Sequence, residues 1–132
     1  MCKSDEKTTA ERREQLNIIT QKTRFVILQN IIAHPRGTPS LEELNYMNPS
    51  KSRSTIRDHI KTLTEADIIE TVKLPPGKRE RDLPYVFYQL TKTGEHLLRD
   101  HGLIRAEKTL KEMHTRLEKT PEIKKCINAP RP

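Results

Sequence analysis

The order in which helix-breaking residues and hydrophobic periodicities follow one another constrains the fold of this chain more than any single motif does. Residues 9–34 contain neither glycine nor proline, and their apolar residues recur at helical spacing. The two prolines and one glycine of residues 34–39 then end this helical region. Ser40 and Glu43 form a capping box, which predicts a short second helix that ends before Pro49.

A third helix is expected from about residue 52 to residue 66, with apolar residues spaced by four and by three on one face. After it the period changes, because the segments 68–74 and 85–90 are rich in β-branched and aromatic residues. The polar, proline-containing residues between these segments predict the long loop of a β-hairpin. A helix, a short helix, a tight turn, a third helix and a two-stranded ribbon follow one another in this order in a winged helix-turn-helix.

The sequence therefore predicts a mainly α-helical, α+β fold with a small β-hairpin wing. A length of 132 residues suits one compact domain, and a hydrophobic fraction of 33% predicts a thin core. The expected parts are a partly helical N-terminal extension at 1–20, a winged helix-turn-helix domain at 21–101, a helix for dimerisation at 102–120 and an irregular C-terminal tail at 121–132.

The charge of the chain limits the classes of partner. Lys and Arg number 25 against 18 Asp and Glu, and the net charge of +7 favours a polyanion such as nucleic acid or an anionic membrane surface. No uncharged apolar stretch approaches the roughly 18 residues that a membrane span requires, and the charged start does not resemble a signal peptide. We therefore expect a cytoplasmic protein without a membrane partner.

The residue types that bind metals or perform catalysis are not arranged for such work. Cys2 and Cys126 are far apart and form no cluster with the five histidines, so neither a zinc site nor a disulfide is predicted. Redox sensing by either thiol stays open, because cysteines near chain ends are often accessible. The sequence has no phosphate-binding glycine loop, nucleophile elbow or zinc-protease motif, so we expect no cofactor and no enzymatic activity.

The third helix carries side chains suited to reading DNA. Residues 51–61 hold four basic residues and one acidic residue, and Arg53 and Arg57 lie one turn apart. The major groove admits one α-helix, and an arginine can donate two hydrogen bonds to guanine O6 and N7. The candidate DNA-binding residues of this helix are Lys51, Ser52, Arg53, Ser54, Thr55, Arg57, Asp58 and Lys61. The alternative is an ordinary solvated charged face.

Basic residues also gather in the expected hairpin. A loop at about 75–84 would project as a wing and could reach the phosphate backbone or the minor groove. Its candidate DNA-binding residues are Lys73, Lys78, Arg79 and Arg81. Phosphate contacts are favoured over base reading, and a solvated polar loop is the alternative.

A stripe of apolar residues near the C-terminal end has the spacing of a heptad repeat. Its steps of three, four, three and four favour a dimer interface, although the stripe covers only about two heptads. The candidate interface residues are Leu103, Ala106, Leu110, Met113 and Leu117, with Leu16 and Ile19 of the N-terminal segment. A homodimer would place two reading helices on two half-sites. The alternative is that this helix packs on its own domain.

The segment from Thr23 to Leu98 resembles the winged helix-turn-helix transcriptional regulators, in particular small archaeal members of the ArsR/MarR/PadR-like group and those of halophilic archaea. Four segments carry the resemblance: Thr23–Leu28, Ser40–Leu44, Ser54–Ile69 and Tyr88–Gly94. The resemblance implies that the third helix reads DNA and that the ribbon is the wing. Halophile proteins are typically acidic and this chain is basic, and Asp67 stands where relatives have a glycine before the ribbon, which predicts a left-handed conformation there.

These observations predict a sequence-specific, double-stranded DNA-binding transcriptional regulator that acts as a homodimer. The reading helix would be at about 52–66 and the wing at about 75–84. One alternative is a winged-helix module of the transcription machinery that docks a protein without reading DNA. A weaker one is single-stranded nucleic acid binding on the aromatic strand. The sequence names no effector, operator or direction of regulation.

Overall fold

The computed structural model describes residues 8–104 and 107–132, and for residues 107–110 and 115 it describes the backbone alone. Cys2 and Ala106 therefore lie outside the described residues, as does the side chain of Leu110. The elements are α1 (Thr9–Thr20), α2 (Lys22–Ala33), α3 (Leu41–Met47), α4 (Arg53–Glu65), β1 (Ile69–Lys73), the 3-10 turn η2 (Pro76–Lys78), β2 (Val86–Leu90), α5 (Lys92–Asp100), α6 (Glu107–Arg116) and α7 (Pro121–Asn128). The mainly helical fold with one antiparallel hairpin is confirmed.

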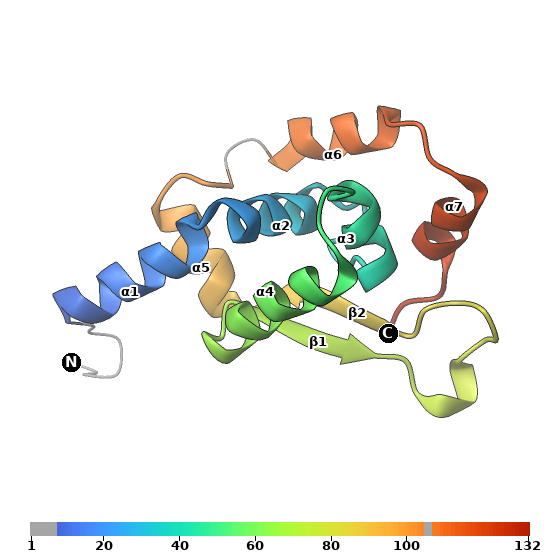
Figure 1. The fold of residues 1–132 in the computed structure, drawn as a ribbon, viewed down its shortest axis with the longest axis horizontal. Helices are drawn as coiled ribbons and strands as arrows, with labels where there is room; N and C mark the ends of the chain where they lie inside the picture. The colour runs from blue at the N-terminus through green and yellow to red at the C-terminus, as the bar shows by residue number, and fades with distance from the viewer. Residues whose placement is uncertain (1–7, 105–106) are drawn as a thin grey trace.

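Figure 1 shows α2 in the middle of the molecule, with α6 on one side and α4 and the hairpin on the other. The core between these layers consists of aliphatic side chains with at most 1% of their surface exposed, including Ile27, Leu28, Ile31, Leu44, Ile56 and Leu63. Most of them come from α2, α3 and α4, so the three helices of the helix-turn-helix share one core. The region from residue 9 to 33 forms two helices that meet at Gln21, whose side chain accepts a hydrogen bond from Arg24 N.

Side-chain caps set the starts of the next two helices. Ser40 accepts from the backbone N–H of Glu43 at the start of α3, as the capping box predicts, and Ser52 accepts from Thr55 N at the start of α4. Pro39 lies between α2 and α3, where its carbonyl accepts a hydrogen bond from Tyr88 N at 3.0 Å. This bond ties the turn before α3 to β2.

The hairpin pairs Ile69 with Leu90 and Lys73 with Val86 in an antiparallel register. Figure 1 shows the loop between its strands projecting beyond the body of the molecule. Asp67 has a φ of 60°, so the predicted left-handed turn between α4 and β1 is confirmed. Asp tolerates this conformation better than most residues do, because its short polar side chain forms local hydrogen bonds.

The C-terminal region differs from the sequence expectation in one respect. Residues 121–128 form a regular helix, α7, and not an irregular tail, because Thr120 caps its first turn by accepting from Ile123 N and Pro121 occupies the first helical position. Helix α6 packs against α2 of the same chain, and α7 packs against α3. Figure 1 shows the end of the chain returning to the hairpin beside β2.

Gly94 in α5 should be irreplaceable, because a Cβ atom there would overlap the backbone carbonyl oxygen of Ile68. We expect Gly94→Ala to lower the free energy of unfolding by about 1–3 kcal/mol, the usual cost of overpacking. Urea denaturation followed by circular dichroism measures this loss. Gly77→Ala is the matched control, since nothing lies within 4 Å of a Cβ at Gly77. Equal stabilities of the two variants would contradict the close packing of α5 on the α4–β1 connection.

Candidate nucleic-acid interface

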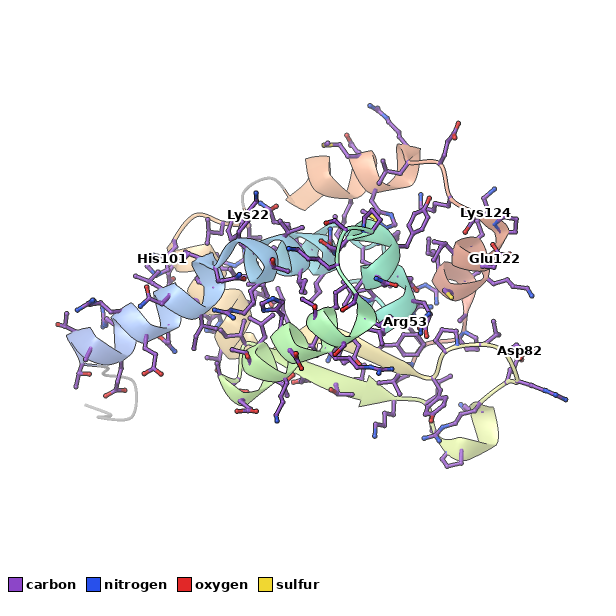
Figure 2. All side chains as sticks on the ribbon, viewed as in Figure 1. Lys22, Arg53, Asp82, His101, Glu122 and Lys124 are labelled. Atoms are coloured by element: carbon purple, nitrogen blue, oxygen red, sulfur yellow. The ribbon has the colours of Figure 1, made fainter. Side chains whose placement is uncertain are left out.

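Helix α4 divides into an apolar face and a polar face, as its sequence predicts. Ile56, Ile60 and Leu63 are buried, with at most 6% of their surface exposed. Figure 2 shows Arg53 at the N-terminal end of α4, toward the same end of the molecule as Asp82 of the wing loop. The exposed candidates of this helix region are Lys51, Ser52, Arg53, Ser54, Arg57, Asp58 and Lys61, and Thr55 is partly exposed. Seven of the eight candidates are thus exposed, on the polar face of α4 or in the turn that leads into it.

The N-terminal turn of α4 is suited to an anion. The first N–H groups of a helix carry a partial positive charge, and the side chains at this turn add basic groups. Arg53 lies 3.5 Å from Glu42 of α3, but both side chains are well exposed, so this ion pair is weak. The guanidinium of Arg53 therefore remains available to a phosphate or a base.

In the wing, Arg79 differs from the other three basic candidates. Its Nε donates to the carbonyl oxygen of Leu74 at 2.9 Å, and its guanidinium carbon lies 3.9 Å from the centre of the Tyr85 ring. These two contacts close the loop between the strands. Lys73, Lys78 and Arg81 are exposed and lie along the wing. Arg79 thus shapes the loop that carries the other basic side chains, a role that the sequence reasoning missed because it gave Tyr85 no partner.

A second interaction missed from the sequence links α2 to α4. Arg24 donates from Nε to the carbonyl oxygen of Ile18 at 2.6 Å, and its Nη1 lies 3.4 Å from His59 Nδ1. Burial lowers the pKa of His59, and the positive charge of Arg24 lowers it further. The lowered pKa favours the neutral ring, so His59 contributes to the contact between α2 and α4 and not to the positive charge of the exposed face.

The residues of the candidate dimer interface lie in different environments. Ile19 is fully buried in the core of its own chain, and Leu16 and Leu103 are partly buried against the same core. Met113 and Leu117 expose 57% and 48% of their surface. They line an open, apolar cleft of about 380 Å³ together with Ala33 of α2 and Met47 of α3. Among the candidate interface side chains that the structure describes, Met113 and Leu117 are the ones exposed enough to contact a partner.

Burial raises the pKa of the half-buried Cys126 thiol, and the nearby carboxylates of Glu42 and Glu43 raise it further. The protonated thiol is the less reactive form, so this environment disfavours redox sensing by Cys126. Across residues 8–104 and 107–132, no group of three or more His, Cys, Asp or Glu side chains is placed to hold a metal ion. No helix in the same residues is long and apolar enough to cross a membrane.

Comparison with known proteins places this geometry in a class. Residues 19–72, which run from the end of α1 into β1, match the family model described as a helix-turn-helix domain. A search of curated proteins finds no significant match. A solved structure described as a protein with a GntR superfamily winged-helix-turn-helix domain, from Halomicrobium mukohataei, is 29% identical with a TM-score of 0.83. The alignment covers 93% of this chain and 87% of that one.

Two further solved structures share the fold at 17% identity. Diamide-treated YodB from B. subtilis has a TM-score of 0.58, and the alignment covers 83% of this chain and 92% of that one. A protein assigned as a transcriptional regulator of the MarR family from Enterococcus faecalis V583 has a TM-score of 0.60, with 86% and 96% covered. At this identity the likeness concerns the fold alone.

Residues 19–72 thus match a helix-turn-helix domain, and together with the antiparallel hairpin they give the chain a winged helix-turn-helix fold. Its particular likeness is to the Halomicrobium protein, and because that alignment spans nearly the whole chain, it extends beyond the helix-turn-helix. The resemblance to winged helix-turn-helix proteins of halophilic archaea is thus confirmed, and the helix-turn-helix match agrees with the prediction of a non-enzymatic class.

Removing the ring that Arg79 covers should loosen the wing without unfolding the domain. We expect Tyr85→Leu to lower the ¹⁵N heteronuclear NOE of residues 76–84, while the free energy of unfolding falls by less than about 1 kcal/mol, because an exposed cation–π contact contributes no more than that. Arg81→Met is the control, since its exposed side chain does not close the loop. Unchanged NOE values in Tyr85→Leu would show that Tyr85 does not order the wing.

Proposed function

We propose that this protein is a sequence-specific, double-stranded DNA-binding transcriptional regulator that acts as a homodimer. The observation that carries the proposal is the exposed polar face of α4, whose basic residues begin at a helix N-terminus capped by Ser52, together with the exposed basic residues of the wing. Arg53 and Arg57 are exposed one turn apart on this face, which is the arrangement that a helix entering the major groove requires.

The two elements would contribute in different ways. In α4, Arg53 and Arg57 would donate to base edges, while Ser52, Ser54 and Lys51 would contact phosphates near the helix start. The wing at 75–84 would lie on the backbone or in the minor groove. There Lys73, Lys78 and Arg81 would displace counterions from phosphates, with Arg79 holding the loop in shape.

The homodimer follows from the small number of base contacts that one reading helix can make. We propose that Met113 of α6 and Leu117, the residue after α6, form the described part of the seam; in the sequence, the heptad spacing continues to Leu110 and Ala106. Exposing two large apolar side chains beside an apolar cleft is unfavourable for a lone chain, and a second copy would cover them. Ile19 is buried in the core of its own chain and Leu16 packs against that core, so neither is included in the proposed seam.

Loss of the two reading arginines should reduce discrimination among sequences more than overall affinity. We expect Arg53→Ala/Arg57→Ala to cost about 1–3 kcal/mol for each base pair read, so that the selected operator binds little better than random duplex. Selection of a preferred duplex from a random pool, followed by fluorescence anisotropy on operator and random DNA, measures the ratio. Unchanged discrimination in the double variant would exclude α4 as the reading helix.

The wing variant Lys78→Ala/Arg81→Ala is the matched contrast, because it should weaken operator and random duplex equally. The slope of log affinity against log salt should flatten by about 0.9 for each lost phosphate contact. Binding of a protein partner by an unaltered chain that binds no duplex would favour the protein-docking alternative, and preference for single strands would favour the aromatic strand.

The dimer has its own test. We expect Met113→Asp/Leu117→Asp to convert the protein to a monomer and to weaken operator binding, because two carboxylates cannot be buried in an apolar seam without a large desolvation cost. Light scattering measures the mass. Glu112→Asp, on the exposed surface of the same helix, is the control. A persistent dimer in the double variant would place the interface elsewhere.

A further inference from the structure

Arg131, at the end of the chain, is almost completely buried. Only 7% of its side-chain surface is exposed, although the helix that precedes it, α7, lies on the surface of the domain. An arginine side chain is almost never buried to this extent unless it is paired. Residues from the turn before α3, from α3 itself and from β2 converge on its guanidinium.

Each nitrogen of this guanidinium has a partner. Nη2 lies 2.7 Å from Glu43 Oε1 in α3, and Nε lies 3.3 Å from the carbonyl oxygen of Thr38. Nη1 donates to the carbonyl oxygens of Cys126 at 2.7 Å and of Ala129 at 2.8 Å. The guanidinium carbon lies 4.3 Å from the centre of the buried Phe87 ring in β2. This fork therefore touches α3, the turn that leads into it, and the wing strand at once.

Glu43 is held from a second side. Its other oxygen, Oε2, lies against His34 Nε2, and both side chains are at most 3% exposed. His34 Nδ1 accepts hydrogen bonds from the backbone N–H groups of Arg36 and Thr38, which fix the position of the ring, and His34 Nε2 also lies 3.3 Å from Arg131 Nη2. The turn between α2 and α3 is thus folded around a buried carboxylate whose charge Arg131 balances.

A net gain in stability is a weak explanation for this arrangement. Removing two charges from water costs nearly as much as their attraction returns, and apolar residues of similar size often stabilise a protein as well or better. What an apolar cluster would lack is direction. The planar fork of an arginine accepts partners only at defined angles, which fixes the relative position of the elements that supply them.

We propose that Arg131 is a positioning residue that fixes the helix-turn-helix relative to the wing. Its partners bracket the Tyr88 N to Pro39 O hydrogen bond, the described backbone link between β2 and the turn before α3. Helix α3 packs against α4, and β2 carries the C-terminal end of the wing loop, so Arg131 sets the angle between the two surfaces proposed to meet DNA. The inference about DNA rests on the proposed function, whereas the inference that Arg131 links α3 to β2 does not.

The test compares Arg131→Met with the unaltered protein by two measurements. Amide hydrogen exchange should accelerate at Tyr88 and at Leu44 of α3 by about tenfold to a hundredfold, as expected when a buried charged group loses its partner, while the amides of α5 change little. The ratio of operator to random-duplex affinity should fall by about tenfold at a temperature where the variant is folded. Arg99→Met, which removes an exposed ion pair with Glu95, is the control and should change neither measurement.

Two further variants separate positioning from stability. Glu43→Gln should reproduce both effects of Arg131→Met, and it serves if the arginine variant does not fold. Arg131→Lys keeps the charge and loses the fork and the stacking on Phe87, so the melting temperature should recover more than the discrimination ratio does.

The possible outcomes are distinct. Equal acceleration of all amides, or unchanged exchange at Tyr88 in both Arg131→Met and Glu43→Gln, would overturn the inference, since Arg131 would then act on stability alone or not at all. Local acceleration without loss of discrimination would overturn its role in DNA reading. If exchange accelerates locally in the variant but the unaltered protein binds no duplex, the link between α3 and β2 would be supported and the proposed function would be wrong.

Discussion

The packing of the apolar face of α4 against α2 and α3 is the interaction on which the rest of the structure depends. Ile56 and Leu63 are completely buried against the side chains of α2 and α3, among them Ile27 and Leu44. Because this face turns inward, the opposite face and its arginines must lie in solvent. The position of α4 also sets the start of the hairpin, through the left-handed residue Asp67 that ends the helix.

A chain with few apolar residues needs other means to hold its surface elements. The wing is closed by one arginine stacked on a tyrosine, α4 is held to α2 by Arg24 and His59, and the C-terminal segment is docked by Arg131 on Glu43. In each case a basic side chain contacts a ring or a backbone carbonyl, so part of the positive charge serves the architecture. The basic residues on the exposed face of α4 and along the wing remain available to bind a polyanion.

Much of the helix-turn-helix could be predicted because its signals are local. Ser40 and Glu43 mark the start of α3, the spacing of apolar residues defines the inner face of α4, and the hairpin follows from alternation and from its prolines. The candidate residues of α4 lie where the spacing places them. Ile19 could not be assigned correctly in this way, because its burial depends on a core that the local pattern does not specify. The stacking of Arg79 on Tyr85 could not be predicted either, because the partner is set by the path of the loop.

The sequence by itself determined where α3 and α4 begin and end, which face of α4 is apolar, and that its free face is basic, since neighbours along the chain settle all three. Only the tertiary structure decided that α6 packs on its own α2, that α7 is docked on α3, and that Glu43 pairs with a residue 88 positions away. The physical reason is that the carboxylate of Glu43 could pair with any of the many basic side chains of this protein. The side chain that pairs with Glu43 is selected by the path of the chain between the two residues, and no local periodicity encodes that path.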